Sequence, residues 1–246
     1  MSLLQLEGIS KKFGQVVVAK EISLQLERGD ALGIVGPNGA GKTSLFAMIS
    51  GDIRPDSGQI DFEGHNLARL SPAKRSRAGI GRTYQVPRPF EHMTVFENAL
   101  LAAQQGARAR GQKSYELAYG ALERTGLADF ANRPAGSLNL LHRKRLEMAR
   151  ALATGPRVLL LDEIAGGLTD MEVNELTTII RGLRDEGIAV LWIEHVVRAL
   201  LSTVDRLLCL AGGVVVADGQ PQTVLASDEV RAVYLGGKII NEVLPQ

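Results

Sequence analysis

The sequence of 246 residues holds one cysteine, Cys209, so no disulfide bond can form within the chain. Cys209 lies in the apolar run RLLCLAGG, which favours a buried and unreactive thiol over a reactive one. A chain without disulfides is typical of a reducing compartment. We therefore expect a soluble protein from such a compartment.

Long apolar runs are lacking as well. A membrane-spanning helix needs about 18 or more consecutive apolar residues. The most apolar region, residues 188–210, is interrupted by charged side chains such as Glu194 and Arg198. The opening residues, MSLLQLEGISKKFG, lack the apolar core of a signal peptide. If a membrane matters to this protein, a partner has to provide it.

Neither sign of charge is in excess, since 28 Lys and Arg residues stand against 27 Asp and Glu residues. This balance does not favour nucleic acid or an acidic membrane as the main partner, although a local patch stays open. The 45% hydrophobic content is enough for a substantial core. We expect one domain over residues 1–246, with a subdomain inside it.

Apolar patterns towards both ends of the chain predict a sheet. Alternation at 22–26 indicates a half-buried strand, and residues 31–36 form a continuous apolar run. Further on, apolar runs at 158–161 and 188–193 flank a helix pattern at 170–185. Alternating strands and helices predict an α/β fold with a parallel sheet.

Helix patterns dominate the middle of the chain, residues 71–153. Thr94 and Glu97 form a capping box at the start of VFENALLAAQQ. A second capping box, Thr169 with Glu172, opens the later helix. We therefore expect the middle segment to be an inserted helical subdomain.

The stretch GPNGAGKT, residues 36–43, matches the phosphate-binding loop pattern G-x-x-x-x-G-K-[ST]. It follows a predicted strand and opens a predicted helix, as the pattern requires. Glycines let backbone N–H groups curl around phosphate oxygens, and the helix N-terminus adds its dipole. Lys42 would reach the β- and γ-phosphates, and the Thr43 hydroxyl would bind Mg²⁺. The pattern predicts nucleotide binding, since a chance match is rare.

Two carboxylates, Asp162 and Glu163, end the apolar strand RVLLLDEI. Adjacent residues at a strand end point to different sides, so the two can take separate roles. Asp162 can assist Mg²⁺, and Glu163 can polarise an attacking water. Taken alone the pair is equally well a solvated strand end, but the phosphate-binding loop upstream favours function.

His195 and Gln85 carry little information by themselves. His195 follows the apolar strand VLWIEH, where a histidine is usually a surface or satisfied core residue. At the end of a strand next to the phosphate-binding strand, it could reach a γ-phosphate. Gln85, after GIGRTY, is ordinarily polar surface, and Phe13, in KKFG, could be a core residue.

Together and in this order, these motifs resemble the ATP-binding cassette (ABC) ATPases over essentially the whole chain. The resemblance implies a P-loop core with an N-terminal antiparallel β subdomain and an inserted α-helical subdomain, with ATP and Mg²⁺ as cofactors. It makes Glu163 the catalytic base, His195 the switch histidine, Gln85 the Q-loop residue, and Phe13 the ring that stacks on adenine. The implied ATP contacts are Phe13, Gly36, Pro37, Asn38, Gly39, Ala40, Gly41, Lys42, Thr43, Ser44 and Gln85. The implied Mg²⁺ site involves Thr43, Gln85 and Asp162.

Finer details look like the ATP-binding subunits of branched-chain amino acid importers. The segments are GIGRTYQVPRPFEHMTVFENAL, ANRPAGSL, RLEMARAL, IEH and VYLGG. The implied partners are transmembrane permease subunits, a second cassette (homodimer or heterodimer) and, indirectly, a solute-binding protein. The implied location is the cytoplasmic face of the plasma membrane. Val86, Phe90, Met93 and Phe96 are either a dock for the permease or ordinary subdomain core.

The family's signature motif, usually L-S-Y-G-Q in this subfamily, reads Leu138, Asn139, Leu140, Leu141 and His142 here. In the family the signature of one cassette contacts the γ-phosphate on its partner, and the glycine allows close backbone approach. We expect Leu141 to obstruct that approach, so that one of two sites in a heterodimer is weak. The alternative is that Asn139, a good helix cap, still serves.

The loop after the carboxylates departs from the family too, because Ile164 stands where a proline usually follows, before AGGLTD. This segment matches the family's D-loop and should still reach the dimer interface. Two rival functions stay open. One is a soluble ABC protein of repair or translation, and the other is a regulatory cassette that binds ATP without hydrolysing it.

Overall fold

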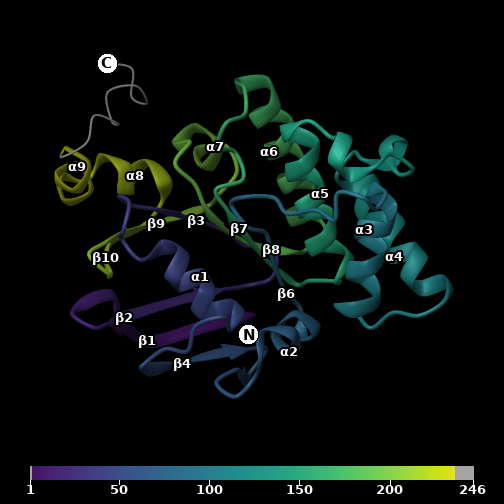
Figure 1. Cartoon of the computed structure of the whole chain (residues 1–246). Coiled ribbons are helices and arrows are strands. Elements are labelled where there is room, and N and C mark those ends of the chain that lie inside the picture. Colours follow the sequence, from purple (N-terminus) through teal and green to yellow (C-terminus); the bar gives the residue numbers. More distant parts are fainter. Residues whose placement is uncertain (1, 236–246) are drawn as a thin grey trace.

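A six-stranded sheet runs through the middle of the molecule, in the order β10-β9-β3-β8-β7-β6 (Figure 1). The computed structural model describes residues 2–235 of the chain. All neighbouring pairs except β10–β9 are parallel, which confirms the predicted parallel sheet. The strands are β3 (Ala31–Val35), β6 (Ile80–Arg82), β7 (Val158–Asp162), β8 (Ala189–Ile193), β9 (Arg206–Ala211) and β10 (Val214–Gly219).

A second, antiparallel sheet lies below the first in Figure 1, with helix α1 (Lys42–Ser50) between the two. Its order is β2-β1-β4-β5. The strands are β1 (Leu4–Phe13), β2 (Val16–Leu26), β4 (Ser57–Phe62) and β5 (His65–Asn66). This is the antiparallel subdomain expected from the sequence.

Three long helices stand together at one side of the central sheet: α3 (Val95–Gln105), α4 (Gln112–Arg124) and α5 (Leu140–Ala153) (Figure 1). They form the expected helical subdomain, with short 3₁₀ turns η1 (Ala128–Phe130) and η2 (Ala135–Ser137). The start of the predicted segment 71–153 holds α2 (Pro72–Ala78) and then β6, which pairs with β7. Residues 80–82 of that segment therefore belong to the central sheet.

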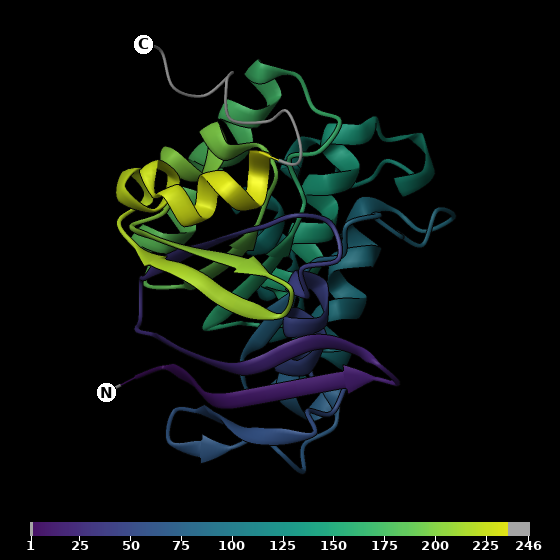
Figure 2. The same ribbon diagram turned by 90° about the vertical axis from the view of Figure 1, so that its left-hand side faces the viewer.

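The remaining helices cover the C-terminal half. They are α6 (Asp170–Asp185), α7 (Val197–Leu201), α8 (Pro221–Ala226) and α9 (Asp228–Leu235). Helices α8 and α9 follow β10 in the chain, and in Figure 2 they lie towards the viewer. Both predicted capping boxes are present, at Thr94 and Thr169. The segment VYLGG continues past the described residues.

The central sheet is buried on both faces, and side-chain alternation divides its residues between two cores. Leu160, Leu191 and Leu208 face α1 and the antiparallel sheet. Leu161 and Trp192 face the other side, where the helices pack. Parallel strands covered on both sides require such continuous apolar runs. No helix within residues 2–235 is long and apolar enough to cross a membrane.

A buried arginine, Arg75 of α2, joins α2 to the end of α1. Its guanidinium donates hydrogen bonds to the carbonyl oxygens of Met48 at 2.7 Å and Ile49 at 3.0 Å. It also donates to Leu67 at 2.9 Å and Leu70 at 3.2 Å. Four carbonyl oxygens around the end of α1 thus depend on one side chain.

Replacing Arg75 with methionine should destabilise the fold by at least about 3 kcal/mol, because it leaves several buried carbonyls without partners. Urea denaturation followed by circular dichroism would measure this loss. Arg77→Met, on the exposed side of the same helix, is the matched control and should change the stability by less than about 0.5 kcal/mol. Equal stability of both variants would contradict the prediction.

Candidate ATP-binding site

The candidate residues converge because β3, β6, β7 and β8 run in parallel. Their carboxyl ends meet at one edge of the sheet. β3 leads into the phosphate-binding loop, β6 into Gln85, β7 into Glu163, and β8 into His195. Four segments far apart in the sequence therefore supply one site.

The phosphate-binding loop follows a path that only glycine allows at two positions. Gly36 has φ 150°, and a Cβ there would lie 2.0 Å from the carbonyl oxygen of Leu210. Gly41 has φ 102°, and a Cβ there would lie 2.0 Å from the carbonyl oxygen of Val18. At these two glycines the loop therefore packs directly against the backbone of Leu210 and Val18.

Helix α1 begins directly at this loop. Its N-cap, Gly41, has no capping side chain, and its first turn carries no acidic residue. The N–H groups of Lys42, Thr43 and Ser44, in that turn, have no acceptor within the helix. These donors and the positive end of the helix dipole fit an anionic ligand such as a phosphate.

Lys42 lies beneath the loop and is almost fully buried. Its Nζ donates to the carbonyl oxygens of Gly36 at 2.7 Å and Pro37 at 3.0 Å. Burial lowers the pKa of Lys42, and the negative charges of Glu163 and Asp162 oppose that shift. The ammonium is thus held at the loop by carbonyls that a phosphate oxygen could replace.

Glu163, Gln85 and His195 are in direct contact. The Gln85 amide donates to Glu163 Oε2, and His195 Nε2 lies 2.9 Å from Glu163 Oε1. Glu163 has φ 48°, a left-handed conformation that is uncommon for any residue but glycine. All three residues singled out from the sequence therefore meet at one carboxylate.

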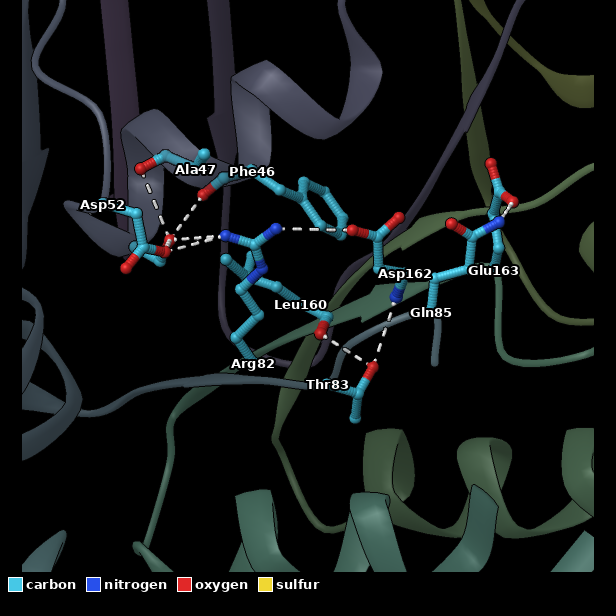
Figure 3. Close-up of polar contacts among 10 residues, drawn as sticks. Phe46, Ala47, Asp52, Arg82, Thr83, Gln85, Leu160, Asp162 and Glu163 are labelled. Carbon is cyan, nitrogen blue, oxygen red and sulfur yellow. Dashed lines mark hydrogen bonds and ion pairs between the residues drawn. The ribbon is translucent and has the colours of Figure 1, made fainter. Parts of the chain in front are cut away.

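Asp162 is buried and paired with Arg82 of β6, as Figure 3 shows. The Arg82 guanidinium lies between two carboxylates, 3.4 Å from Asp162 and 2.9 Å from Asp52 after α1. Thr83 accepts a hydrogen bond of 3.2 Å from the Asp162 N–H. Burial raises the pKa of Asp162, and the Arg82 charge opposes that shift.

A cavity of about 420 Å³ opens beside these groups. Thr43, Gln85 and Asp162, the three residues implied for Mg²⁺, all line it, together with Arg82 and Tyr84. No group of three or more His, Cys, Asp or Glu side chains within residues 2–235 could hold a metal ion. A Mg²⁺ ion is typically bound in proteins through one or two carboxylates, waters and substrate phosphates, and Asp162 with the Thr43 hydroxyl fits such a partial ligand set.

Comparison with known proteins fits this geometry: residues 19–166 match the family described as ABC transporter. The chain is a member of this family. A branched-chain amino acid transport ATP-binding protein of Pseudomonas aeruginosa, BraF, is 34% identical over 95% of the chain and 98% of its own length. A lipopolysaccharide export ATP-binding protein of Acidithiobacillus ferridurans, LptB, is 37% identical over 95% and 97%.

Among solved structures, a nucleotide-free ATP-binding cassette from an ABC transporter aligns with a TM-score of 0.87 and 30% identity, over 96% of this chain and all of that one. Family, relatives and fold agree on the activity. The protein is an ABC ATPase, the ATP-binding subunit of a transporter.

The ABC ATPase keeps Phe13 exposed at the tip of the β1–β2 hairpin, where Phe13 pairs with Val16. Val18 of the same hairpin contacts the phosphate-binding loop at Gly41. The hairpin tip therefore lies beside the loop, and the Phe13 ring presents a surface on which a base could stack. Lys11 Nζ lies 5.2 Å from the ring centre.

The signature segment starts helix α5. Asn139 is its N-cap, and its side chain accepts a hydrogen bond of 2.9 Å from the His142 N–H. The side chain expected to stand in a partner's way, Leu141, is 6% exposed and faces the protein's own interior. Leu140 is 45% exposed instead, next to Gly167 of the D-loop. A helix turns about 100° per residue, so consecutive leucines face different sides.

Four residues near the site were not singled out from the sequence. Arg82 and Thr83 hold Asp162, while Lys144 and Glu194 contact the segments around Glu163. Their spacing in the sequence matches no motif, because each acts through a contact with a residue on another strand, helix or loop. Only the adjacency of Glu194 to His195 hinted at a role.

Lys42→Ala should weaken ATP binding by at least about tenfold, because it removes the cation that meets the β- and γ-phosphates. Isothermal titration calorimetry with ATP would measure the affinity. Lys113→Ala, at the exposed start of α4, is the control and should bind ATP like the wild type. Unchanged affinity in Lys42→Ala would exclude the loop as the phosphate site.

Proposed function

We propose that this ABC ATPase drives an importer of branched-chain amino acids or related small polar solutes. ATP binding closes a dimer of cassettes, and hydrolysis reopens it. The observation that carries the transport mechanism is the contact between Gln85 and Glu163. It joins the surface that a permease would touch to the group that would activate water.

In this mechanism the phosphate-binding loop and Lys42 hold the β- and γ-phosphates, and Phe13 stacks on the base. Thr43, Gln85 and Asp162 would hold Mg²⁺, which would neutralise phosphate charge. Glu163 accepts a proton from the attacking water, and His195 contacts Glu163 at 2.9 Å. Gln85 contacts the same carboxylate.

The permease would dock on the groove that follows Gln85. Tyr84, Val86 and Phe90 are between 46% and 62% exposed there, which is high for large apolar side chains. Met93 is half-buried, and Phe96 packs against the helical core and Tyr115. The exposed side chains of Tyr84, Val86 and Phe90 support docking of a permease. Phe96 contributes to the core of the helical subdomain instead.

Import of an amino acid is favoured by the motif segments and by relatives such as BraF. The relatives include export proteins such as LptB, so export is the alternative outcome. For import, the partners are transmembrane permease subunits, a second cassette and, indirectly, a solute-binding protein. The location is then the cytoplasmic face of the plasma membrane. Purifying the native complex and measuring leucine uptake into vesicles would decide between import and export. Uptake supports import, whereas lipid extraction without uptake would favour export.

The signature segment, residues 138–142, supports a heterodimer in which the second cassette has a different sequence. Leu140 projects from the start of α5, where the family requires close approach to a partner's phosphate. The N-terminus of α5 itself is intact, since Asn139 caps it. A homodimer would carry two obstructed sites, whereas a cassette with an intact signature would complete the site of this chain.

Glu163→Gln should retain ATP binding but lower the hydrolysis rate by about a hundredfold or more, the range expected when a positioned base is lost. Phosphate release under saturating ATP would measure the rate, and calorimetry the affinity. Glu175→Gln, at an exposed position of α6, is the matched control. A Glu163→Gln variant that turns over normally would assign the base to another group.

Restoring the family pattern with Asn139→Ser, Leu140→Tyr, Leu141→Gly and His142→Gln should raise the ATPase rate of the isolated chain about tenfold or more. The change removes the exposed Leu140 side chain, so that the backbone donors at the start of α5 can approach the γ-phosphate, where they act most strongly in the transition state. Steady-state ATPase assays at protein concentrations that span dimerisation would measure the gain.

The same four changes combined with Glu163→Gln provide the control, because any gain must then disappear. Brisk wild-type activity that the four changes do not improve would mean that the leucines are tolerated. The proposal of one weak site per heterodimer would then be wrong.

A further inference from the structure

The Glu194 side chain holds two functional segments at once. It follows β8 and is 1% exposed. Its Oε1 accepts a hydrogen bond of 2.6 Å from the N–H of Ala165, in the D-loop. Its Oε2 accepts from the N–H groups of His195 at 2.9 Å and Val196 at 3.2 Å. One oxygen thus holds the D-loop, and the other holds the histidine segment.

Lys144 links helix α5 to the backbone of Glu163. The side chain is 4% exposed, and its Nζ donates to the carbonyl oxygen of Glu163 at 3.4 Å. Burial lowers the pKa of Lys144, and the charges of Glu194 and Glu163 oppose that shift. Burial raises the pKa of Glu194, and its three N–H donors and Lys144 oppose it. Both buried side chains thus contact the segments around Glu163, Lys144 at its carbonyl oxygen and Glu194 at the N–H of Ala165.

The backbone of Glu163 needs such support. Its φ of 48° is strained for a residue with a side chain, at a cost of order 1–3 kcal/mol. The Glu163 N–H donates to the carbonyl oxygen of Ile193 at 2.9 Å, and its carbonyl oxygen accepts from Lys144. Both peptide groups of Glu163 are thereby fixed, one by β8 and one by α5.

We propose that Glu194 and Lys144 are a pair of buried positioning residues that fix Glu163 and His195 relative to the start of helix α5. Glu194 acts through the N–H groups of Ala165, His195 and Val196, and Lys144 acts through the carbonyl oxygen of Glu163. The signature and Lys144 lie on the same helix, one turn apart, so a movement of α5 reaches the carbonyl of Glu163 through Lys144. Neither side chain lines the cavity at Thr43, Gln85 and Asp162. The role rests on the proposed function of Glu163 as base.

Glutamine at position 194 tests this directly. The carboxylate accepts from N–H groups on both oxygens, whereas glutamine has a single acceptor oxygen and an amide that donates. Glu194→Gln must therefore release either Ala165 or the His195 segment, with almost no change in volume. Lys144→Met removes the other member of the pair and keeps the length of the side chain.

The rate should be measured in single-turnover experiments with the full chain in excess over ATP, beside calorimetry of ATP binding. Each variant should lower the rate by about ten- to a hundredfold, the range seen when partners that orient active-site groups are removed. ATP affinity should stay within about twofold, because the phosphate-binding loop is untouched. The double variant should lose less than the product of the two single effects, since both side chains act on the position of Glu163.

The matched control is Glu175→Gln. Glu175 of α6 also pairs with α5, through Arg145, the neighbour of Lys144, but neither contacts Glu163. It should hydrolyse ATP at the wild-type rate. A wild-type rate in Glu194→Gln would overturn the proposal. An equal loss of rate and affinity would overturn it too, because it would indicate general structural support.

Amide hydrogen exchange separates this proposal from the function on which it rests. Glu194→Gln should speed exchange at Ala165 or at His195 and Val196, while β8 stays protected. If wild type hydrolyses ATP no faster than Glu163→Gln, the proposed role of Glu163 as base fails. The exchange pattern alone then decides whether Glu194 and Lys144 act as positioning residues. Unchanged exchange at all three amides would exclude that role.

Discussion

Parallel pairing of β3, β8, β7 and β6 is the constraint on which the rest of this ABC ATPase depends. Parallel strands bring their carboxyl ends to one edge, so the loops that leave this edge lie close together. The phosphate-binding loop, Gln85, Glu163 and His195 meet there. A shift of one residue in the register of β7 would turn Asp162 away from α1 and towards the helices.

Charge is concentrated at that edge, and the buried charges there are held by ion pairs or by backbone groups. Arg82 stands between Asp52 and Asp162, and Lys144 donates to the carbonyl oxygen of Glu163. Breaking one member of such a pair leaves an uncompensated charge in a poorly hydrated place, which costs more than the pair contributes. The network therefore fixes geometry more than it adds stability.

The helical subdomain contacts this edge through two routes. The segment after β6 carries Gln85 to Glu163, next to the exposed groove at Tyr84 and Val86. Helix α5 carries Lys144 to the carbonyl of Glu163 and presents Leu140 at its start. One route leads to the proposed permease surface and the other to the proposed cassette interface. Both end at the same residue, so the proposed partner contacts and the proposed chemistry meet at Glu163.

The sequence by itself determined the local features: the phosphate-binding loop, two capping boxes, and strands ending in Asp162–Glu163 and His195. Each is encoded within a few residues, by glycine spacing, by a Thr–Glu pair or by an apolar run. Tertiary structure alone decided that β6 joins the central sheet, that Leu141 turns inward while Leu140 stays exposed, and that Arg82, Lys144 and Glu194 become partners of the site. Those outcomes depend on contacts between segments up to 80 positions apart, such as Arg82 with Asp162. No local pattern records such contacts, because the burial of a charge is set by whichever distant segment packs against it.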